Sequence, residues 1–189
     1  GYIIWNHPGW PDDKSTFYPI HEELIKAGKI DAYEVYNYME SYPLTFDWYE
    51  KYGIAPVANT DIHGTVAGDY PCEDGEFRPM TLVFAKEKSE TGIREALDAR
   101  RTLAFFHGTL VGDKEYLTKL VGACLDTRPL GEEKIQVTNV SDISYRMSDG
   151  KYLYLFPAGK TVIISKPATE LTVLNCLYGH KKHLKYSFQ

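Results

Sequence analysis

The sequence lacks the features that mark several large classes of protein. None of its apolar runs approaches the roughly 18 residues that cross a membrane, and it carries no secretory leader. Its three cysteines, Cys72, Cys124 and Cys176, lie far apart without CxxC spacing, so they indicate neither a metal knuckle nor a disulfide framework. It also has no GxSxG elbow or Cys/His signature of a protein nucleophile. These absences argue against a membrane protein and leave the compartment, periplasm or cytoplasm, open.

Composition is typical of a soluble globular protein with one large or two small domains. The chain has 189 residues, of which 43% are hydrophobic and 25% charged, with a net charge of -5. Nucleic acids and anionic membranes are bound by clustered Lys and Arg, so this acidic balance argues against both partners. One small basic cluster, Lys181–Lys185, is interpreted as a solvated strand face.

Short apolar runs alternate with amphipathic segments from residue 1 to about residue 127. This alternation predicts a mostly parallel sheet with helices outside it. Glycines follow the first two predicted helices, and Ser89 is placed to cap the third. The predicted strands are 2–5, 32–36, 55–59, 80–85 and 103–106, and the predicted helices are 19–26, 44–52, 89–101 and 114–125.

The pattern changes after Arg128–Glu133, a turn-rich charged segment that we interpret as a linker. From Lys134 onward the apolar runs are short, β-branched and aromatic, and turn residues separate them. Such runs predict a small antiparallel β-sandwich. The expected division is therefore an α/β domain over residues 1–128 and a β domain over 134–189.

The motif Asp61-Ile-His63 closes the apolar run that ends at Asn59. Side chains two residues apart on a strand point the same way, so this spacing places a carboxylate and an imidazole side by side at the mouth of a sheet. An oxygen and a nitrogen ligand in that position can share a metal cluster. A turn Asp beside a surface His is the alternative interpretation.

Two other predicted strands end in similar side chains. The first ends at His7, which Pro8 should hold in an extended conformation, and the second contains Glu34 and ends at Asn37. Reactive groups gather at the carboxyl ends of strands in barrels and open α/β sheets. Together with Asp61 and His63, these residues favour a metal site.

Taken in order, these motifs resemble the PHP (polymerase and histidinol phosphatase) family of metal-dependent phosphoesterases. The resemblance runs through the segments 3–10, 34–37, 60–63, 78–89 and 92–101. It implies a distorted (β/α)7 barrel with up to three divalent metals, Zn, Mn or Fe, at its mouth. His7 would bind one metal, and Asp61 and His63 would bind two different ones. Glu34 and Asn37 match a family segment near the site, without an assigned ligand role.

The chain departs from the family pattern at its start. The family opens with an HxH strand, further histidines and a bridging glutamate, none of which precedes Gly1. We therefore expect the C-terminal portion of a PHP barrel followed by the β domain, active in the full-length protein and inactive as this chain alone. Half a barrel leaves an unpaired edge, so residues 2–5 should face absent strands, another chain or a second copy in a homo-oligomer.

The function that the resemblance implies is hydrolysis of a small phosphomonoester or phosphodiester by metal-bound hydroxide. Arg78 would hold the substrate phosphate if the strand that follows it runs antiparallel, and is otherwise a surface residue. The alternative function is a non-catalytic binding module whose β domain recognises a carbohydrate or a protein. His107 also ends a predicted strand, but it lies outside the family motifs and is expected to have no functional role.

Overall fold

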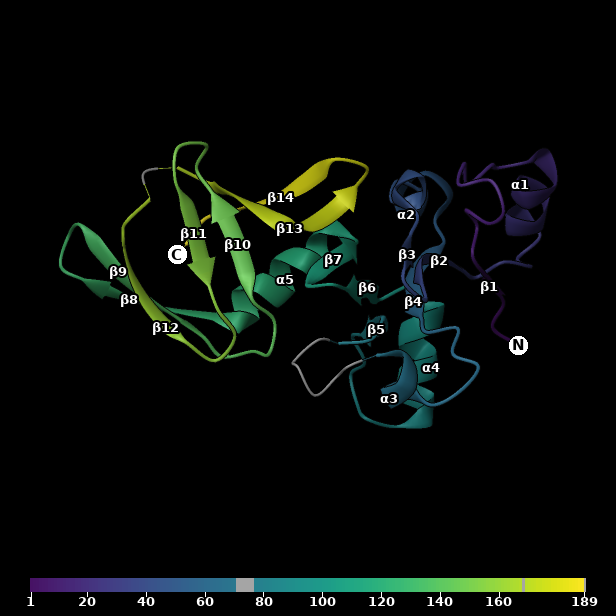
Figure 1. Ribbon diagram of the computed structural model, residues 1–189, viewed down its shortest axis with the longest axis horizontal. Helices are drawn as coiled ribbons and strands as arrows, with labels where there is room; N and C mark the ends of the chain where they lie inside the picture. The colour runs from purple at the N-terminus through teal and green to yellow at the C-terminus, as the bar shows by residue number, and fades with distance from the viewer. Residues whose placement is uncertain (71–76, 168, 189) are drawn as a thin grey trace.

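The computed structural model describes residues 1–70, 77–167 and 169–188, so Cys72 lies outside the described residues. The chain forms an elongated mixed α/β molecule built on three sheets (Figure 1). The N-terminus lies at the α/β end, and the C-terminus lies in the opposite half, which is mostly strands. Within the described ranges, no helix has the length and apolar character needed to span a membrane.

The N-terminal sheet has three parallel strands, β1 (Ile4–Trp5), β2 (Ala32–Asn37) and β4 (Ala55–Asn59). Strand β2 is buried along its whole length because it pairs with β4 throughout and with β1 over its first residues. Strand β3 (Glu40–Ser41) folds back antiparallel onto the end of β2. The predicted strand at 55–59 is confirmed, and the other two are confirmed with shifted ends.

Short helices flank this sheet. Helix α1 (Pro19–Lys26) has the predicted bounds, with proline at its first position. The single helix predicted over 44–52 is wrong, because the segment splits into a 3-10 turn, η1 (Pro43–Thr45), and α2 (Trp48–Tyr52). A third helix, α3 (Val66–Asp69), was not predicted. The ring of Trp5 contacts those of Phe17, His21 and Trp48, which fastens α1 and α2 to β1.

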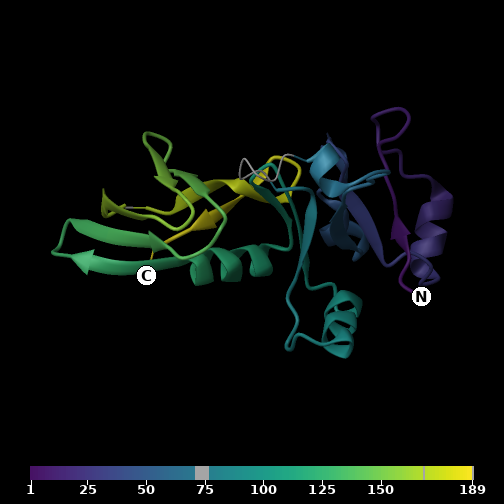
Figure 2. The same cartoon turned by 60° about the horizontal axis from the view of Figure 1, so that its bottom comes forward.

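The largest sheet has seven strands and joins the two ends of the molecule. Strands β5 (Met80–Val83), β6 (Thr102–Phe106) and β7 (Thr109–Gly112) form an antiparallel meander, so the mostly parallel sheet predicted for this region is wrong beyond β4. Helix α4 (Glu90–Asp98) connects β5 to β6, and Ser89 caps it by accepting the N–H of Gly92, as predicted. Figure 2 shows α4 projecting from the body of the molecule.

Strand β7 also pairs in parallel with β13 (Leu171–Gly179) from the C-terminal region. Beyond β13 the same sheet contains β10 (Tyr145–Ser148), β11 (Leu153–Phe156) and β14 (Lys182–Tyr186). The sheet therefore crosses the boundary expected from the sequence, and the division into two domains stays a prediction.

The third sheet contains β8 (Leu125–Leu130), β9 (Lys134–Asn139) and β12 (Thr161–Ser165). The predicted linker at 128–133 is in fact the end of β8 and a tight turn into β9. Helix α5 (Lys114–Cys124), the third sheet and the seven-stranded sheet share one apolar core that includes Leu117, Val137 and Tyr145.

Two threonines join the N-terminal sheet to the seven-stranded sheet. The Thr102 hydroxyl donates to the carbonyl of Pro56 at 2.8 Å, and the Thr81 hydroxyl bonds both backbone groups of Ala58. Strand β1 pairs with β2 alone within the part of the chain that the structure describes, and no closed barrel forms there. This arrangement leaves the carboxyl ends of β1, β2 and β4 accessible.

Candidate functional site

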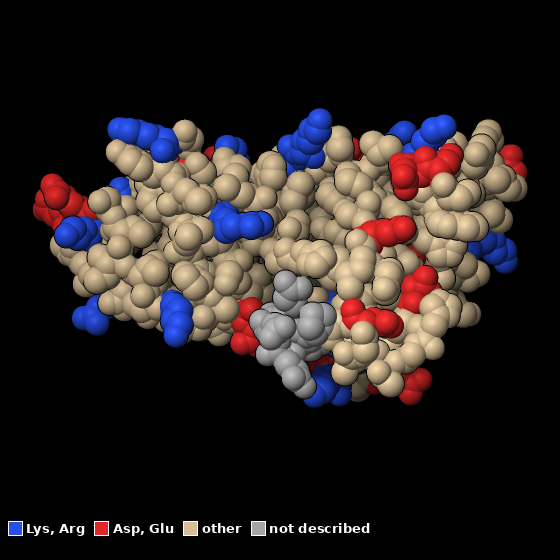
Figure 3. All heavy atoms as spheres, viewed as in Figure 1, with Lys and Arg blue, Asp and Glu red and all other residues tan. Residues whose placement is uncertain are grey.

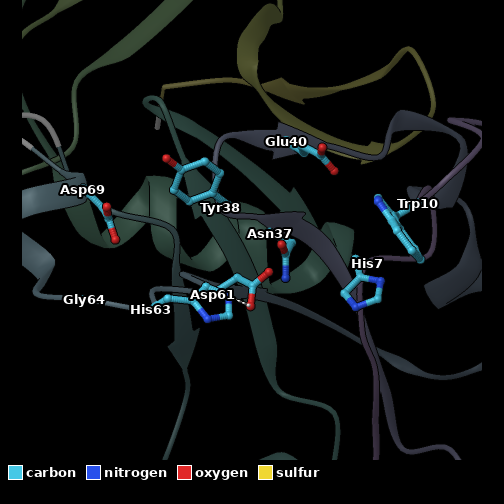
Figure 4. A pocket seen from close by; sticks show the side chains of 9 residues that line it. All are labelled: His7, Trp10, Asn37, Tyr38, Glu40, Asp61, His63, Gly64 and Asp69. Carbon is cyan, nitrogen blue, oxygen red and sulfur yellow. Dashed lines mark ion pairs between the residues drawn. The ribbon is translucent and has the colours of Figure 1, made fainter.

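A pocket of about 500 Å³ opens where β1, β2 and β4 end (Figure 4). The structure brings His7, Asn37, Asp61 and His63 together in it, although they come from three separate strand ends. In the view of Figure 4, the side chains of Asp61 and Asn37 lie between the two imidazoles. The other lining residues are Trp10, Tyr38, Glu40, Gly64 and Asp69.

His7 is held by hydrogen bonds and not by the extended conformation expected before Pro8. Its φ is 32°, in the left-handed region, so the expectation from the following proline is wrong. The N–H of His7 donates to the Glu34 carboxylate, and its carbonyl accepts the N–H of Trp10 at 3.0 Å, closing a turn. Tertiary hydrogen bonding has overridden the local preference.

Glu34 does not line the pocket but lies directly behind it. Its side chain is 1% exposed and accepts hydrogen bonds from the amides of Asn37 at 2.8 Å and Asn59 at 2.7 Å. With the N–H of His7, these bonds join the ends of β1, β2 and β4 through one carboxylate. Glu34 therefore positions the residues of the site. Sequence reasoning missed Asn59, whose only signal was its place as the last residue of a buried strand.

Asp61 and His63 lie beyond the end of β4, in a loop. The expected alternation of side chains along a strand does not bring them together, because Asp61 has a left-handed φ of 47°. The loop still places the His63 Nε2 3.6 Å from the Asp61 Oδ1. The two side chains are 90% and 48% exposed, so this contact contributes little to stability. It leaves both groups accessible to a ligand.

Left-handed backbone at His7 and Asp61 is informative because L-residues adopt it at a cost on the order of 1 kcal/mol or more. Such conformations gather at active sites and ligand clamps, where the surrounding structure enforces them. Here the hydrogen bond between His7 and Glu34 supplies that enforcement for one of the two residues.

Acidic groups and buried tyrosines surround the pocket. The hydroxyl of Tyr42 donates to Glu40 at 2.7 Å, and burial, followed by this bond, raises the pKa of Tyr42 above its ordinary value. The hydroxyl of Tyr70 donates to the Thr60 carbonyl at 2.9 Å, and burial raises the pKa of Tyr70 to about 12. Both phenols therefore stay protonated at neutral pH. Figure 3 shows acidic side chains gathered over this half of the molecule.

Two imidazoles with neighbouring carboxylates form a donor set that suits divalent transition metals. The described residues, however, contain no group of three His, Cys, Asp or Glu side chains that could hold a metal ion. The metal roles of His7, Asp61 and His63 stay predictions.

Two other residues from the sequence analysis lie outside this pocket. Arg78 is exposed and precedes β5, which pairs antiparallel with the later strand β6, and it does not line the pocket. The role predicted for Arg78 in binding phosphate stays a prediction. His107 forms the turn between β6 and β7 and lines a separate pocket with Tyr36 and Phe106.

Comparison with known proteins gives one informative likeness. No family model matches the chain, and no curated protein matches it significantly. The fold is similar to the crystal structure of a two-domain protein from Bacteroides vulgatus ATCC 8482 that contains a predicted PHP-like metal-dependent phosphoesterase. The TM-score is 0.89 and the sequence identity 30%, over 98% of this chain and 61% of that one. This likeness supports a relation to PHP-like phosphoesterases, and the chain spans less than two thirds of that neighbour.

Proposed function

We propose that the protein containing this chain is a metal-dependent phosphoesterase, and that β1, β2 and β4 form part of its PHP-type barrel. The observation that carries this proposal is the convergence of His7, Asp61 and His63 in one pocket at the carboxyl ends of parallel strands. The likeness to a protein described as metal-dependent supports it.

In this proposal His7, Asp61 and His63 supply metal ligands, and residues outside this chain complete the set. Divalent metals, when bound, activate water near neutral pH and offset charge on the phosphoryl oxygens. The chain's own contribution is orientation. Glu34 fixes the turn at His7, while Asn37 presents an amide at the edge of the pocket.

The substrate class proposed is a small phosphomonoester or phosphodiester. A pocket of about 500 Å³ admits a small phosphorylated molecule, and its open position among exposed side chains leaves room for a leaving group. Glu40 and Asp69 line the same pocket, and their charge would repel a phosphate in the absence of bound cations.

The test is hydrolysis of p-nitrophenyl phosphate and bis-p-nitrophenyl phosphate by the full-length protein supplied with Mn²⁺ or Zn²⁺. Asp61→Asn keeps the shape of the side chain but removes its charge, so we expect kcat to fall about a hundredfold or more. Asp126→Asn is the matched control, because Asp126 is an exposed residue of β8 outside this pocket. We expect it to stay within about threefold of the wild type.

Chelation by EDTA should abolish the activity, and returning the metal should restore it. Absence of hydrolysis by the metal-loaded, full-length protein would refute the enzyme proposal and favour the binding-module alternative. Full activity in Asp61→Asn would refute the assignment of the site.

A further inference from the structure

A second pocket, which we call the histidine pocket, lies behind the hairpin formed by β2 and β3. We define it by a floor of Tyr36, Phe46 and Phe106 and a rim of His107, Lys181 and His183, and its volume is about 400 Å³. Alternate residues of the hairpin line the two pockets, with Tyr38 and Glu40 at the candidate metal site and Met39 and Ser41 at the histidine pocket. The hairpin therefore forms a wall between them.

The floor of the histidine pocket is aromatic and largely buried. The ring of Tyr36 lies 5.8 Å from that of Phe106 and 6.3 Å from that of Phe46. At the edge of this floor the imidazole of His107 packs on Phe106, with ring centroids 3.7 Å apart. Such a surface favours an aromatic or apolar group, because stacking and burial of apolar area both stabilise it there.

The rim carries cationic and hydrogen-bonding side chains from two hairpin turns. His107 belongs to the turn between β6 and β7, and Lys181 to the turn between β13 and β14. His183 contributes a buried Nδ1 that has no hydrogen-bond partner in the described part of the chain.

The charge of this rim has one sign. Among the described residues that line the histidine pocket there is no Asp or Glu, in contrast to the candidate metal site with Glu40, Asp61 and Asp69. An anion entering the histidine pocket would meet an ammonium group and imidazoles without an opposing carboxylate. Its oxygens could then accept charge-assisted hydrogen bonds.

The walls of the pocket are fixed before any ligand arrives. The tip of the β13–β14 hairpin lies beside α2 (Figure 1), where Lys182 pairs at 2.9 Å with Asp47, the residue before that helix. The ring Nδ1 of His180 bonds the carbonyl of Pro43 at 3.1 Å. Opposite, the buried Asn175 amide donates to the Gly108 carbonyl at 2.7 Å, which anchors the turn that carries His107. A preformed pocket avoids the entropy cost of ordering its walls on binding.

We propose that the histidine pocket binds a small molecule in which an aromatic ring carries an oxyanion of the phosphate or phosphonate type. The ring lies on Tyr36, Phe46 and Phe106, and the oxyanion faces His107, Lys181 and His183. This site is separate from the candidate metal site and does not depend on metal.

The test uses phenylphosphonate, which carries both groups and has no ester bond to hydrolyse. Isothermal titration calorimetry in EDTA should give a dissociation constant below about 1 mM, a modest affinity for a ligand of this size. The double variant His107→Gln/Lys181→Gln should weaken binding at least tenfold. Lys160→Gln, which removes an exposed lysine from another turn, should leave the constant unchanged within twofold.

Two ligand controls separate the contributions of ring and charge. Inorganic phosphate and benzyl alcohol should each bind at least tenfold more weakly than phenylphosphonate. Absence of saturable binding at 10 mM, or equal affinity in the double variant, would overturn the proposal. If Asp61→Asn lost binding while the double variant kept it, the ligand would lie at the candidate metal site, and this result would also overturn the proposal. Because the titration contains no metal, a failure to bind phenylphosphonate would not bear on the metal-dependent hydrolysis proposed above.

Discussion

Glu34 provides the sharpest test of how the candidate site is held together. The residue is buried, and no cationic side chain of the described residues pairs with its carboxylate. The carboxylate accepts three N–H hydrogen bonds, one from each of three strand ends. An ionised carboxylate only accepts hydrogen bonds, which matches this set of donors. Removing it therefore leaves the amides of Asn37 and Asn59 and the N–H of His7 without their acceptor.

The expected loss in Glu34→Ala follows from these contacts. Asn37 is 5% exposed and Asn59 is half-buried, so their unpaired amides should cost about 1–2 kcal/mol each, while water can reach the N–H at His7. The vacated volume adds to this cost, and removal of a buried charge offsets part of it. We expect Glu34→Ala to lower the free energy of unfolding by about 2–4 kcal/mol, which corresponds to a fall of about 5–15 °C in Tm.

Glu34→Gln separates hydrogen bonding from shape. Glutamine keeps one acceptor, and Asn59 can turn its amide to present an oxygen to the new NH2 group, so we expect about 1–2 kcal/mol. Both variants should also weaken Mn²⁺ binding by the full-length protein about 10–100-fold, since Glu34 orients His7. Urea denaturation measures the first effect and metal titration the second. Glu22→Ala, which removes an exposed ion pair with Lys26, is the control and should cost under about 0.5 kcal/mol. A Glu34→Ala variant as stable as this control would refute the reasoning.

Three further outcomes test the scaffold. Burial lowers the pKa of His21 in the folded protein, where its Nδ1 accepts the N–H of Tyr18. The unfolded chain therefore binds more protons at this residue than the folded one. The free energy of unfolding should fall as the pH drops from 6.5, the ordinary pKa, to the lower pKa of the folded state. His21→Gln, which can cap α1 at any pH, should flatten that dependence in thermal melts at pH 5 and pH 7.5. Gly112→Ala should destabilise by more than about 1 kcal/mol in urea, because φ is 154° and a Cβ would lie 2.6 Å from Leu103, and an unchanged midpoint would contradict this. Asp113→Ala should cost about 0.5–2 kcal/mol and Asp113→Asn less, because this side chain caps α5.

Local signals in the sequence predicted the starts of two helices, but not how the strands pair. Proline at the first position fixes the start of α1, and the carboxylate of Asp113 fixes that of α5, so both helices begin where the sequence predicts. Strand β7 was missed because its residues, Thr109–Gly112, fill the short space between a strand and a helix cap. Its pairing with β13 joins residues far apart in the chain, and no local pattern specifies it.

Part of the pocket lining could be predicted from the sequence, but the directions of its side chains could not, and Arg78 lies outside it. Strand ends indicated His7, Asn37, Asp61 and His63, and all four line one pocket. The reasons expected for their directions were nevertheless wrong, because a proline and a strand period act locally. The observed directions come from the hydrogen bond that the His7 N–H donates to Glu34 and from the left-handed backbone at Asp61.

His107 shows why a motif search alone overlooks a site of another kind. As a lone histidine in a turn it matches no ligand spacing, and nothing in the local pattern associates it with Lys181 or His183. The association arises because β13 lies beside β7, which brings the turn after β6 and the β13–β14 hairpin to opposite sides of one aromatic floor. A pocket assembled this way depends on the long-range pairing. A substitution that removes the anchor at Asn175 should therefore weaken phenylphosphonate binding, although His107 and Lys181 are both still present in the chain. Asn175→Ala tests this separately from the rim variants, and unchanged affinity there would show that the pocket does not depend on the fixed turn.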